Sequence, residues 1–352
     1  FFLRTSHLAR ICEITWVKLH LQIQRPLWTL PISDLLQNKL KDAGFDYVED
    51  ILHEANAEAT KQIVQDTKLD LTQFTKISTK TALEALKADI ENDDNIVTFS
   101  KAIDDLFDGG IPTGRLTELI GAPGCGKTQL CLQLCVSVQM PKFLGGLDGY
   151  AVYIETNSNF SVKRIKEIHK SCASHCVNIS QKLPSSSRSE SDLQQFLKEN
   201  PLRKIIKFSV ENVEELRSSI FTVRSQLETS SNNVKLIVID SFIFPFYLTD
   251  ADLDRTKMVT EILIQLHQLA SNHHLAVVIT NELTTCILDN GATEVTPSLG
   301  ESFAHIIHNR VMLGKQKRDD FYSAIMQKSF EYSSGSAYFQ ICQDGVRDVP
   351  TE

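Results

Sequence analysis

One octapeptide constrains the fold of this chain more than any other feature. Residues 121–128 satisfy the pattern G-x-x-x-x-G-K-[ST], follow an apolar run at 116–121 and open an amphipathic helical pattern that begins at Lys127. Glycines between a buried strand and a helix let backbone N–H groups surround phosphate oxygens, and the helix N-terminus adds a favourable dipole. The sequence therefore predicts an α/β domain with a P-loop. The expected phosphate-binding residues are Gly121, Ala122, Pro123, Gly124, Cys125, Gly126, Lys127 and Thr128.

Two residues are expected to hold a magnesium ion beside bound ATP. Thr128 ends the P-loop, where its hydroxyl can coordinate Mg²⁺ while Lys127 reaches the β- and γ-phosphates. Asp240 supplies the second ligand, because it ends an apolar run at 236–239 that reads as a buried strand. Ligands bind at the carboxyl edge of such sheets. The expected cofactors are ATP and Mg²⁺, with Thr128 and Asp240 as the metal ligands.

Apolar strands alternate with amphipathic helices through most of the chain, which is typical of a mostly parallel sheet with helices on both faces. After Arg310 the spacing changes, and closely spaced strands indicate antiparallel hairpins that finish the sheet. Strands are expected at 116–121, 151–155, 205–210, 236–240, 275–280, 311–313, 322–326 and 337–341, and helices from Lys127, Val162, Val213 and Asp254.

Four segments are expected along the chain. Residues 1–29 read as a leader, whose first 25 positions carry four basic residues and one acid, a bias that mitochondrial presequences share. Residues 30–70 have apolar residues at helical spacing and a glycine, Gly44, that ends one helix before another begins. This small helical domain resembles a helix-hairpin-helix module, and a plain helical adaptor is the alternative. Residues 71–98 form a polar linker, and residues 99–352 form the core.

The composition limits how the chain can meet other molecules. Its formal net charge is −8, the opposite of the basic surface that binds duplex phosphates, so contact with DNA must be local or shared. No run of 18 or more apolar residues predicts a membrane span. The eight cysteines have no disulfide-framework spacing, which indicates a reducing compartment.

The two motifs are far apart in sequence. Thr128 and Asp240 are separated by 112 residues with two strands between them, whereas small-molecule P-loop kinases usually bring these motifs closer together. From 99 to 348 the chain resembles the RecA/RadA superfamily of DNA strand-exchange ATPases, and within it the eukaryotic recombinase paralogues of the group designated C. The resemblance rests on the segments at 102–106, 109–112, 121–134, 151–156, 244–246, 272–277, 280–281 and 299–302.

The resemblance implies a RecA-type P-loop core whose ATP site lies between neighbouring protomers. It also implies partners, namely other recombinase paralogues, the main recombinase and single-stranded or branched DNA. A nuclear location follows, with room for a cytoplasmic or mitochondrial pool. Arg164, four residues after Phe160, matches a family arginine that packs against adenine, and a solvated helix arginine is the alternative.

The chain departs from the family at two catalytic positions. The family strand after the P-loop ends in Asp-Thr-Glu-Gly, whose Glu is the general base, and this chain has Asn157 there. An amide cannot take a proton, so catalysis worth about 10²–10⁴-fold should be lost. The family has Asn-Gln at the end of the next strand after the one that ends in Asp240, and this chain has Asn281 and Glu282 there. Like charges about 4 Å apart repel by roughly 4 kcal/mol at an effective dielectric of 20, so Glu282 must turn away from phosphate, be protonated or pair with a cation.

Two further sets of residues bear on DNA binding and on metal binding. The candidate DNA loops, 241–257 and 284–302, hold six acids and two basic residues, so DNA binding by the chain alone should be weak. His169, Cys172 and Cys176 share a helical face and could ligate zinc, although ordinary helix packing is the favoured interpretation.

Three functional hypotheses follow. The leading one is an ATP-binding subunit of a recombinase paralogue complex that acts in homologous recombination and double-strand break repair. The rival is an active DNA-dependent ATPase that performs strand exchange itself, with Glu282 or a partner residue as the base. A small-molecule kinase is disfavoured by the spacing of the motifs.

Overall fold

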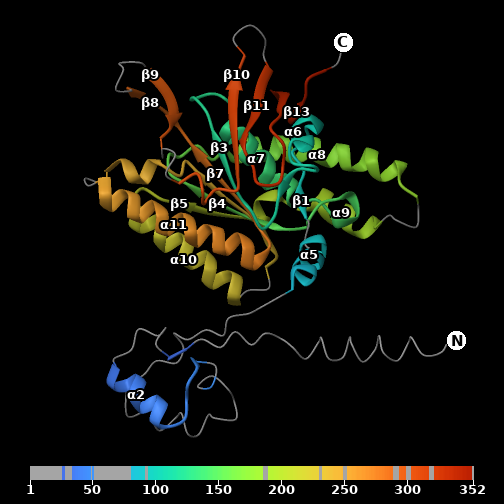
Figure 1. The fold of residues 1–352 in the computed structure, drawn as a ribbon. Coiled ribbons are helices and arrows are strands. Elements are labelled where there is room, and N and C mark those ends of the chain that lie inside the picture. The colour runs from blue at the N-terminus through green and yellow to red at the C-terminus, as the bar shows by residue number, and fades with distance from the viewer. Residues whose placement is uncertain are drawn as a thin grey trace, which may run out of the picture. The chain divides into compact units, whose positions relative to one another are not determined.

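The structure, a computed structural model, describes two compact units, residues 1–87 and 88–352 (Figure 1). The described residues are 26–27, 34–48, 50, 81–91, 94–184, 189–229, 232–248, 252–287, 293–298, 303–316 and 321–350. The expected leader, apart from Pro26 and Leu27, lies outside them, as does much of the expected linker. Each unit is considered by itself below.

Among the described residues of the first unit, a short helix is followed by a glycine turn. Helix α2 (Asp34–Asp42) ends where Gly44 takes a φ of +88°, a left-handed conformation that glycine adopts without strain. The amide of Phe45 then donates to the carbonyl of Leu40 at 3.0 Å, and both side chains are buried together with that of Val48. Gly44 thus ends a helix as expected, whereas residue 49 and residues 51–80, where the second helix was expected, lie outside the described residues.

The second unit is built on a sheet of nine strands, in the order β13-β12-β11-β10-β3-β7-β6-β4-β5. The six strands from β10 to β5 run parallel, and β11, β12 and β13 continue the sheet antiparallel. The strands are β3 (Leu116–Ile120), β4 (Tyr150–Glu155), β5 (Ile205–Ser209), β6 (Val234–Asp240), β7 (Ala276–Asn281), β10 (Asn309–Lys315), β11 (Phe321–Lys328), β12 (Ser336–Cys342) and β13 (Gly345–Asp348). The predicted α/β class, the mostly parallel sheet and the closing antiparallel hairpins are confirmed.

Helices cover both faces of this sheet, as Figure 1 shows. Alternate residues of each strand point to opposite faces, so Tyr153 and Val238 join the apolar core beneath α7 (Lys127–Ser137) and α8 (Val162–Lys182). Their neighbours Ile154 and Ile239 join the core beneath α10 (Val213–Thr229) and α11 (Asp252–His273). Strands that are buried on both faces explain the continuous apolar runs in the sequence.

Shorter elements complete the unit. The hairpin of β8 and β9 follows β7, and the small pair of β1 and β2 precedes β3. Their bounds are β1 (Asn95–Ile96), α6 (Lys101–Asp105), β2 (Ile111–Pro112), α9 (Glu190–Lys198), β8 (Leu283–Ile287) and β9 (Thr293–Pro297), with 3-10 turns η4 (Lys142–Leu144), η6 (Pro201–Lys204) and η7 (Phe244–Leu248). Helix α5 (Ala82–Glu91) begins in the first unit and ends in the second.

An acid on the last strand, β13, accepts hydrogen bonds from the start of α6, the first helix of the core. Asp348 accepts hydrogen bonds from the Ser100 hydroxyl at 2.7 Å and from the amides of Lys101 and Ala102, both at 3.0 Å. Burial raises the pKa of Asp348, but these hydrogen bonds outweigh it and the net pKa lies below the ordinary value. The carboxylate therefore satisfies amides at the start of α6 that have no partner within the helix.

A buried polar group ties three strands together in the middle of the sheet. The carboxylate of Glu118 on β3 accepts from the Arg310 guanidinium on β10 at 2.6 Å and from the Asn281 amide on β7 at 2.8 Å. Glu118 and Asn281 are fully buried and Arg310 is 3% exposed. A buried charge needs such a partner, because the interior cannot solvate it. These contacts fix the position of Asn281, the residue before Glu282.

This triad generates a stability prediction. Arg310→Met should lower the free energy of unfolding by about 3–5 kcal/mol, because it leaves Glu118 as a buried and uncompensated charge. Urea unfolding followed by circular dichroism measures the loss. The double variant Glu118→Gln with Arg310→Met removes both charges and keeps an acceptor for Asn281, so it should recover more than half of the loss. An equal loss in both variants would assign the effect to packing and not to the unpaired carboxylate.

Candidate nucleotide-binding site

A pocket of about 410 Å³ lies over the P-loop, at the edge where the parallel strands end. The adjacent strands β3, β7, β6 and β4 end in the P-loop, Asn281, Asp240 and Glu155, so sequence-distant residues meet at one edge. The pocket is lined by Pro123, Gly124, Gly126, Lys127, Thr128, Gln129, Asn157, Asn159, Asp240, Glu282, Tyr322 and Ile341.

The P-loop backbone leaves room for phosphate because its glycines have no side chain. Gly126 takes a φ of +97°, and a Cβ atom on it would lie 2.6 Å from the Cδ1 atom of Ile341. Gly126 is also the N-cap of α7, and as a glycine it offers no side chain that could accept a hydrogen bond from the first turn of that helix. The helix N-terminus is thus directed at the pocket, an arrangement that suits an anion.

Lys127 is buried beneath this loop and has an anionic partner. Its ammonium donates to the carbonyl of Gly121 at 2.6 Å and to that of Ala122 at 3.3 Å. A third contact, at 3.1 Å, joins Lys127 Nζ to the carboxylate Oε2 of Glu282. Of the three outcomes expected for Glu282, the structure shows pairing with a cation, and that cation is the P-loop lysine itself.

Asp240 is held by three hydroxyl groups. Its Oδ2 atom accepts from Thr128 at 2.7 Å and from the Tyr153 hydroxyl at 2.9 Å, and its Oδ1 atom accepts from Thr280 at 2.6 Å. Burial and the nearby Asp240 carboxylate raise the pKa of Tyr153, so the phenol keeps its proton and remains a donor. A carboxylate and a hydroxyl at the pocket are hard oxygen donors of the kind that Mg²⁺ prefers, so the residues fit this ion.

Tyr153 and Thr280 are site residues that the sequence motifs do not mark. Glu155 pairs in register with Asp240, so these two side chains face the same side of the sheet. Tyr153 lies two positions before Glu155 on the same strand and therefore faces that side too. Thr280 immediately precedes Asn281. The alternation of side-chain direction along β4 and β7 could have indicated these two residues, but only with the knowledge that both strands are neighbours of β6. Tyr322 and Ile341, which line the pocket from β11 and β12, also required the sheet order.

No general base is positioned by the strand that follows the P-loop helix. Asn157 is exposed and lines the pocket through a side-chain amide. The nearest acid on the strand, Glu155, is bound by the ammonium of Lys207, the Ser209 hydroxyl at 2.9 Å and the amide of Phe160 at 3.1 Å. Burial raises the pKa of Glu155, but these donors outweigh it and lower the net pKa. Glu155 therefore stabilises the loop and is not free to accept a proton.

Arg164 contacts a residue that lines the pocket, Gln129, but does not line the pocket itself. Its guanidinium donates to the carbonyls of Gln343 and Cys342, at 2.7 and 2.6 Å, and to the side chain of Gln129 at 2.8 Å. These bonds join α8 to the turn between β12 and β13. Gln129 lines the pocket and Arg164 does not. Packing of Arg164 against adenine therefore stays a prediction, and the structure gives it a positioning role as well.

The zinc hypothesis is not supported. The described residues contain no group of three His, Cys, Asp or Glu side chains that could hold a metal ion. His169 packs on Phe196 with a ring distance of 4.9 Å, and the Cys172 sulfur lies 3.4 Å from the Gln133 amide. Burial lowers the pKa of His169 and raises that of Cys172. The shared helical face of these residues points into the core, so ordinary packing is the correct interpretation.

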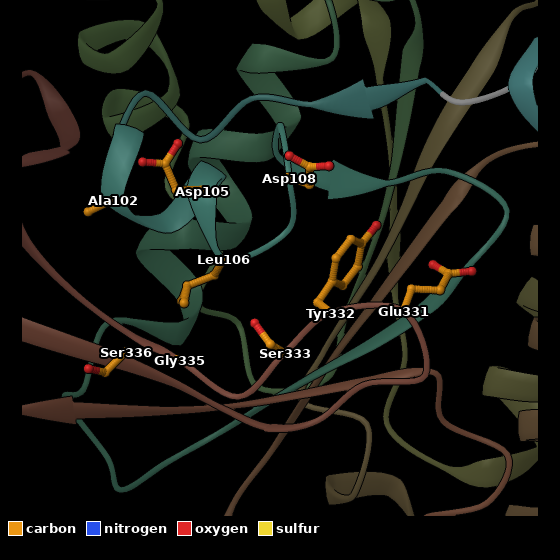
Figure 2. A pocket seen from close by; sticks show the side chains of 9 residues that line it. All are labelled: Ala102, Asp105, Leu106, Asp108, Glu331, Tyr332, Ser333, Gly335 and Ser336. Atoms are coloured by element: carbon orange, nitrogen blue, oxygen red, sulfur yellow. The ribbon is translucent and has the colours of Figure 1, made fainter.

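A second pocket, of about 580 Å³, lies between α6 and the segment that joins β11 to β12. Figure 2 shows the carboxylates of Asp105, Asp108 and Glu331 around it, together with the ring of Tyr332. Acidic side chains repel phosphate, and no residue of the P-loop lines this pocket. It does not compete with the P-loop pocket as the nucleotide site.

The candidate DNA loops are described only in part. Residues 249–251, 288–292 and 299–302 lie outside the described residues, so the charge of the loops stays a sequence-based expectation. After β6, Phe244 and Tyr247 are 45% and 53% exposed, and their rings lie edge to face at 6.1 Å. The exposed aromatic pair is a feature of this segment that its charge pattern does not reveal.

Comparisons with known proteins place the chain among repair proteins. The family model described as Rad51 matches residues 94–200 and 195–349. The DNA repair protein RAD51 homolog 3 of Cricetulus griseus is 33% identical over 346 residues, which cover 93% of each chain. The protein of the same name from Dictyostelium discoideum is 33% identical over 76% of this chain and 69% of its own. The DNA repair and recombination protein RadA of Metallosphaera sedula is 29% identical over 90% of this chain and 94% of its own.

Among the described residues, no helix is long and apolar enough to cross a membrane.

The contact between Tyr153 and Asp240 generates a prediction for the metal. Tyr153→Phe removes one donor to the carboxylate and should weaken Mg²⁺-dependent nucleotide binding by about 10-fold, the usual cost of losing an outer partner of a metal ligand. Nucleotide titrations with Mg²⁺ and with EDTA measure the effect. Tyr338→Phe, at an exposed tyrosine on β12, is the matched control. The assignment fails if Tyr153→Phe weakens binding equally in EDTA, because the change would then act on the pocket and not on the ion.

Proposed function

The chain belongs to the Rad51 family, and on that premise we propose that it serves homologous recombination and double-strand break repair as the ATP-binding subunit of a recombinase paralogue complex. Its family model covers most of the chain, and its relatives carry names that describe DNA repair and recombination. Membership also removes the small-molecule kinase from the alternatives. Binding and not turnover of nucleotide is the proposed role of the P-loop site.

One observation carries this proposal: the pocket is built to hold phosphates and has no positioned base. Asn157 offers an amide, Glu155 is engaged by three donors, and one oxygen of Glu282 accepts from Lys127. Phosphoryl transfer depends on positioning and charge stabilisation, and hydrolysis also needs a group that orients or activates water. A site that positions phosphates and stabilises their charge, but has no group to orient or activate water, should retain ATP.

Each polar residue of the pocket has a distinct part in that retention. Lys127 and the amides at the start of α7 bind the phosphates, while Thr128 and Asp240 would hold Mg²⁺. When bound, the ion neutralises phosphate charge. Tyr153 and Thr280 orient the Asp240 carboxylate through their hydrogen bonds. Tyr322 and Ile341 offer apolar surface at the rim, where a nucleotide base could rest.

The proposed partners are other recombinase paralogues and the main recombinase, with single-stranded or branched DNA bound within the complex. A net charge of −8 argues against strong binding of DNA phosphates by this chain alone. The exposed pair of Phe244 and Tyr247 offers ring faces on which bases could stack, an interaction that needs no charge. We propose the nucleus as the place of action. The relatives' names do not support a cytoplasmic or mitochondrial pool, and the mitochondrial pool rests on the basic bias of residues 1–25 alone.

Lys127→Ala tests the proposal directly. It should abolish nucleotide retention and assembly with a recombinase paralogue together, because the phosphates lose the only lysine of the P-loop. Nucleotide content is measured after gel filtration, and assembly is measured by co-elution with the partner. Lys163→Ala, at a side chain that is 90% exposed on α8, is the control and should behave like the unmodified chain. Full assembly by a Lys127→Ala protein that holds no nucleotide would refute nucleotide gating.

The active ATPase remains the second candidate, because Glu282 lies at the pocket and carries a carboxylate. A double-mutant cycle on the rate of hydrolysis, with partner and DNA present, separates the two. If binding is the role, Asn157→Glu alone should not restore turnover, and Asn157→Glu with Glu282→Gln should raise it by about 10²-fold or more. If Glu282 is the base, Glu282→Gln alone should remove an activity that the unmodified chain already has. Additive effects would mean that the two residues do not share a phosphate.

A further inference from the structure

We infer that Glu282 takes the place of a γ-phosphate at Lys127, so that this site accepts a nucleoside diphosphate at least as readily as the triphosphate. The inference rests on the proposed nucleotide-binding function and adds the specificity of that site. It concerns one ion pair, between Lys127 Nζ and Glu282 Oε2 at 3.1 Å.

The ammonium of Lys127 has an acceptor for each of its three protons. Two acceptors are carbonyl oxygens, of Gly121 and Ala122, and the third is the carboxylate of Glu282. The Lys127 side chain is 7% exposed and that of Glu282 is 30% exposed, so the carboxylate lies on the open side of a buried cation. An incoming γ-phosphate therefore meets a cation whose charge is already balanced by an anion of this chain.

The backbone around Glu282 is fixed by several contacts. The amide of Glu282 donates to the Asn281 side chain at 2.8 Å, and its carbonyl accepts from the amide and the hydroxyl of Ser298, both at 2.9 Å. Asn281 in turn donates to the fully buried Glu118 at 2.8 Å. The position of the carboxylate thus follows from the centre of the sheet and from the β8–β9 hairpin, which contains Thr296 and Pro297 and is followed by Ser298.

A diphosphate and a triphosphate differ in what they require of this ion pair. A diphosphate has no terminal phosphate to place beside Glu282, so it can bind Lys127 and the amides at the start of α7 while the carboxylate stays in place. A triphosphate must either displace Glu282 or place its terminal phosphate beside a carboxylate, and each alternative opposes binding.

The isosteric change Glu282→Gln isolates the charge. It keeps the size of the side chain and removes the negative charge, so it should favour the triphosphate selectively. The affinities of the full chain for ADP and for the non-hydrolysable analogue adenylyl imidodiphosphate are measured by calorimetric titration with Mg²⁺. The unmodified chain should bind ADP as tightly as the analogue or more tightly. Glu282→Gln should shift the ratio toward the analogue by about 10-fold or more, equivalent to about 1.4 kcal/mol.

Glu214→Gln is the matched control, because Glu214 is exposed on α10 and contributes nothing to the lining of the pocket. It should leave the ratio unchanged. The inference is overturned if the unmodified chain binds the analogue about 10-fold more tightly than ADP, or if Glu282→Gln leaves the ratio as it was. The ratio in the unmodified chain decides the question even if the variant does not fold.

Assembly with a recombinase paralogue, measured on the same samples, separates this inference from the proposed function. Assembly in ADP as well as in the analogue, together with the expected ratio, supports both. The expected ratio without assembly in either nucleotide supports the inference and refutes the proposed function. Assembly in the analogue alone, together with preferential binding of the analogue, supports the proposed function and overturns the inference.

Discussion

The balance of charge around Lys127 governs this site. A buried ammonium is costly unless acceptors surround it, and here two backbone carbonyls and one carboxylate of the chain meet that need. The loop that supplies the carbonyls keeps its shape because Gly126 tolerates a left-handed conformation. The carboxylate comes from a different strand, so the same ammonium joins the P-loop to the end of β7. Each phosphate that enters must rearrange a cation that already has partners.

The sheet converts this local balance into a property of the whole core. Asn281, which precedes Glu282, is held by Glu118, and Glu118 is held by Arg310, so a row of buried polar groups runs across β7, β3 and β10. Parallel strands that are buried on both faces cannot shift register without moving side chains into the wrong layer. The geometry at the pocket is thus set by the rigid centre of the sheet and less by the loops around it.

Contiguous signals were readable in the sequence, whereas contacts across strands were not. The strands were predictable because burial on both faces gives continuous apolar runs, and Lys127, Thr128 and Asp240 were predictable because each sits in a local motif. Tyr153 and Thr280 depend on which strands are neighbours, which no local pattern encodes. The three outcomes for Glu282 could not be separated, because the choice depends on the distance to Lys127. The zinc hypothesis failed because a shared helical face does not reveal whether it meets solvent or core. Strand β13 was missed because four residues beginning with Gly345 carry no clear alternation.

The contact of Asp348 with the start of α6 has a consequence for how the chain is made. The carboxylate belongs to the last strand, and the amides that it satisfies lie 246 and 247 residues earlier. Contacts between such distant residues form late, since the intervening chain must first be brought into place. During synthesis the beginning of the core therefore leaves the ribosome long before its stabilising acid exists. The start of α6 therefore receives these hydrogen bonds only after β13 has been made, so synthesis alone sets the order in which this part of the core can be joined.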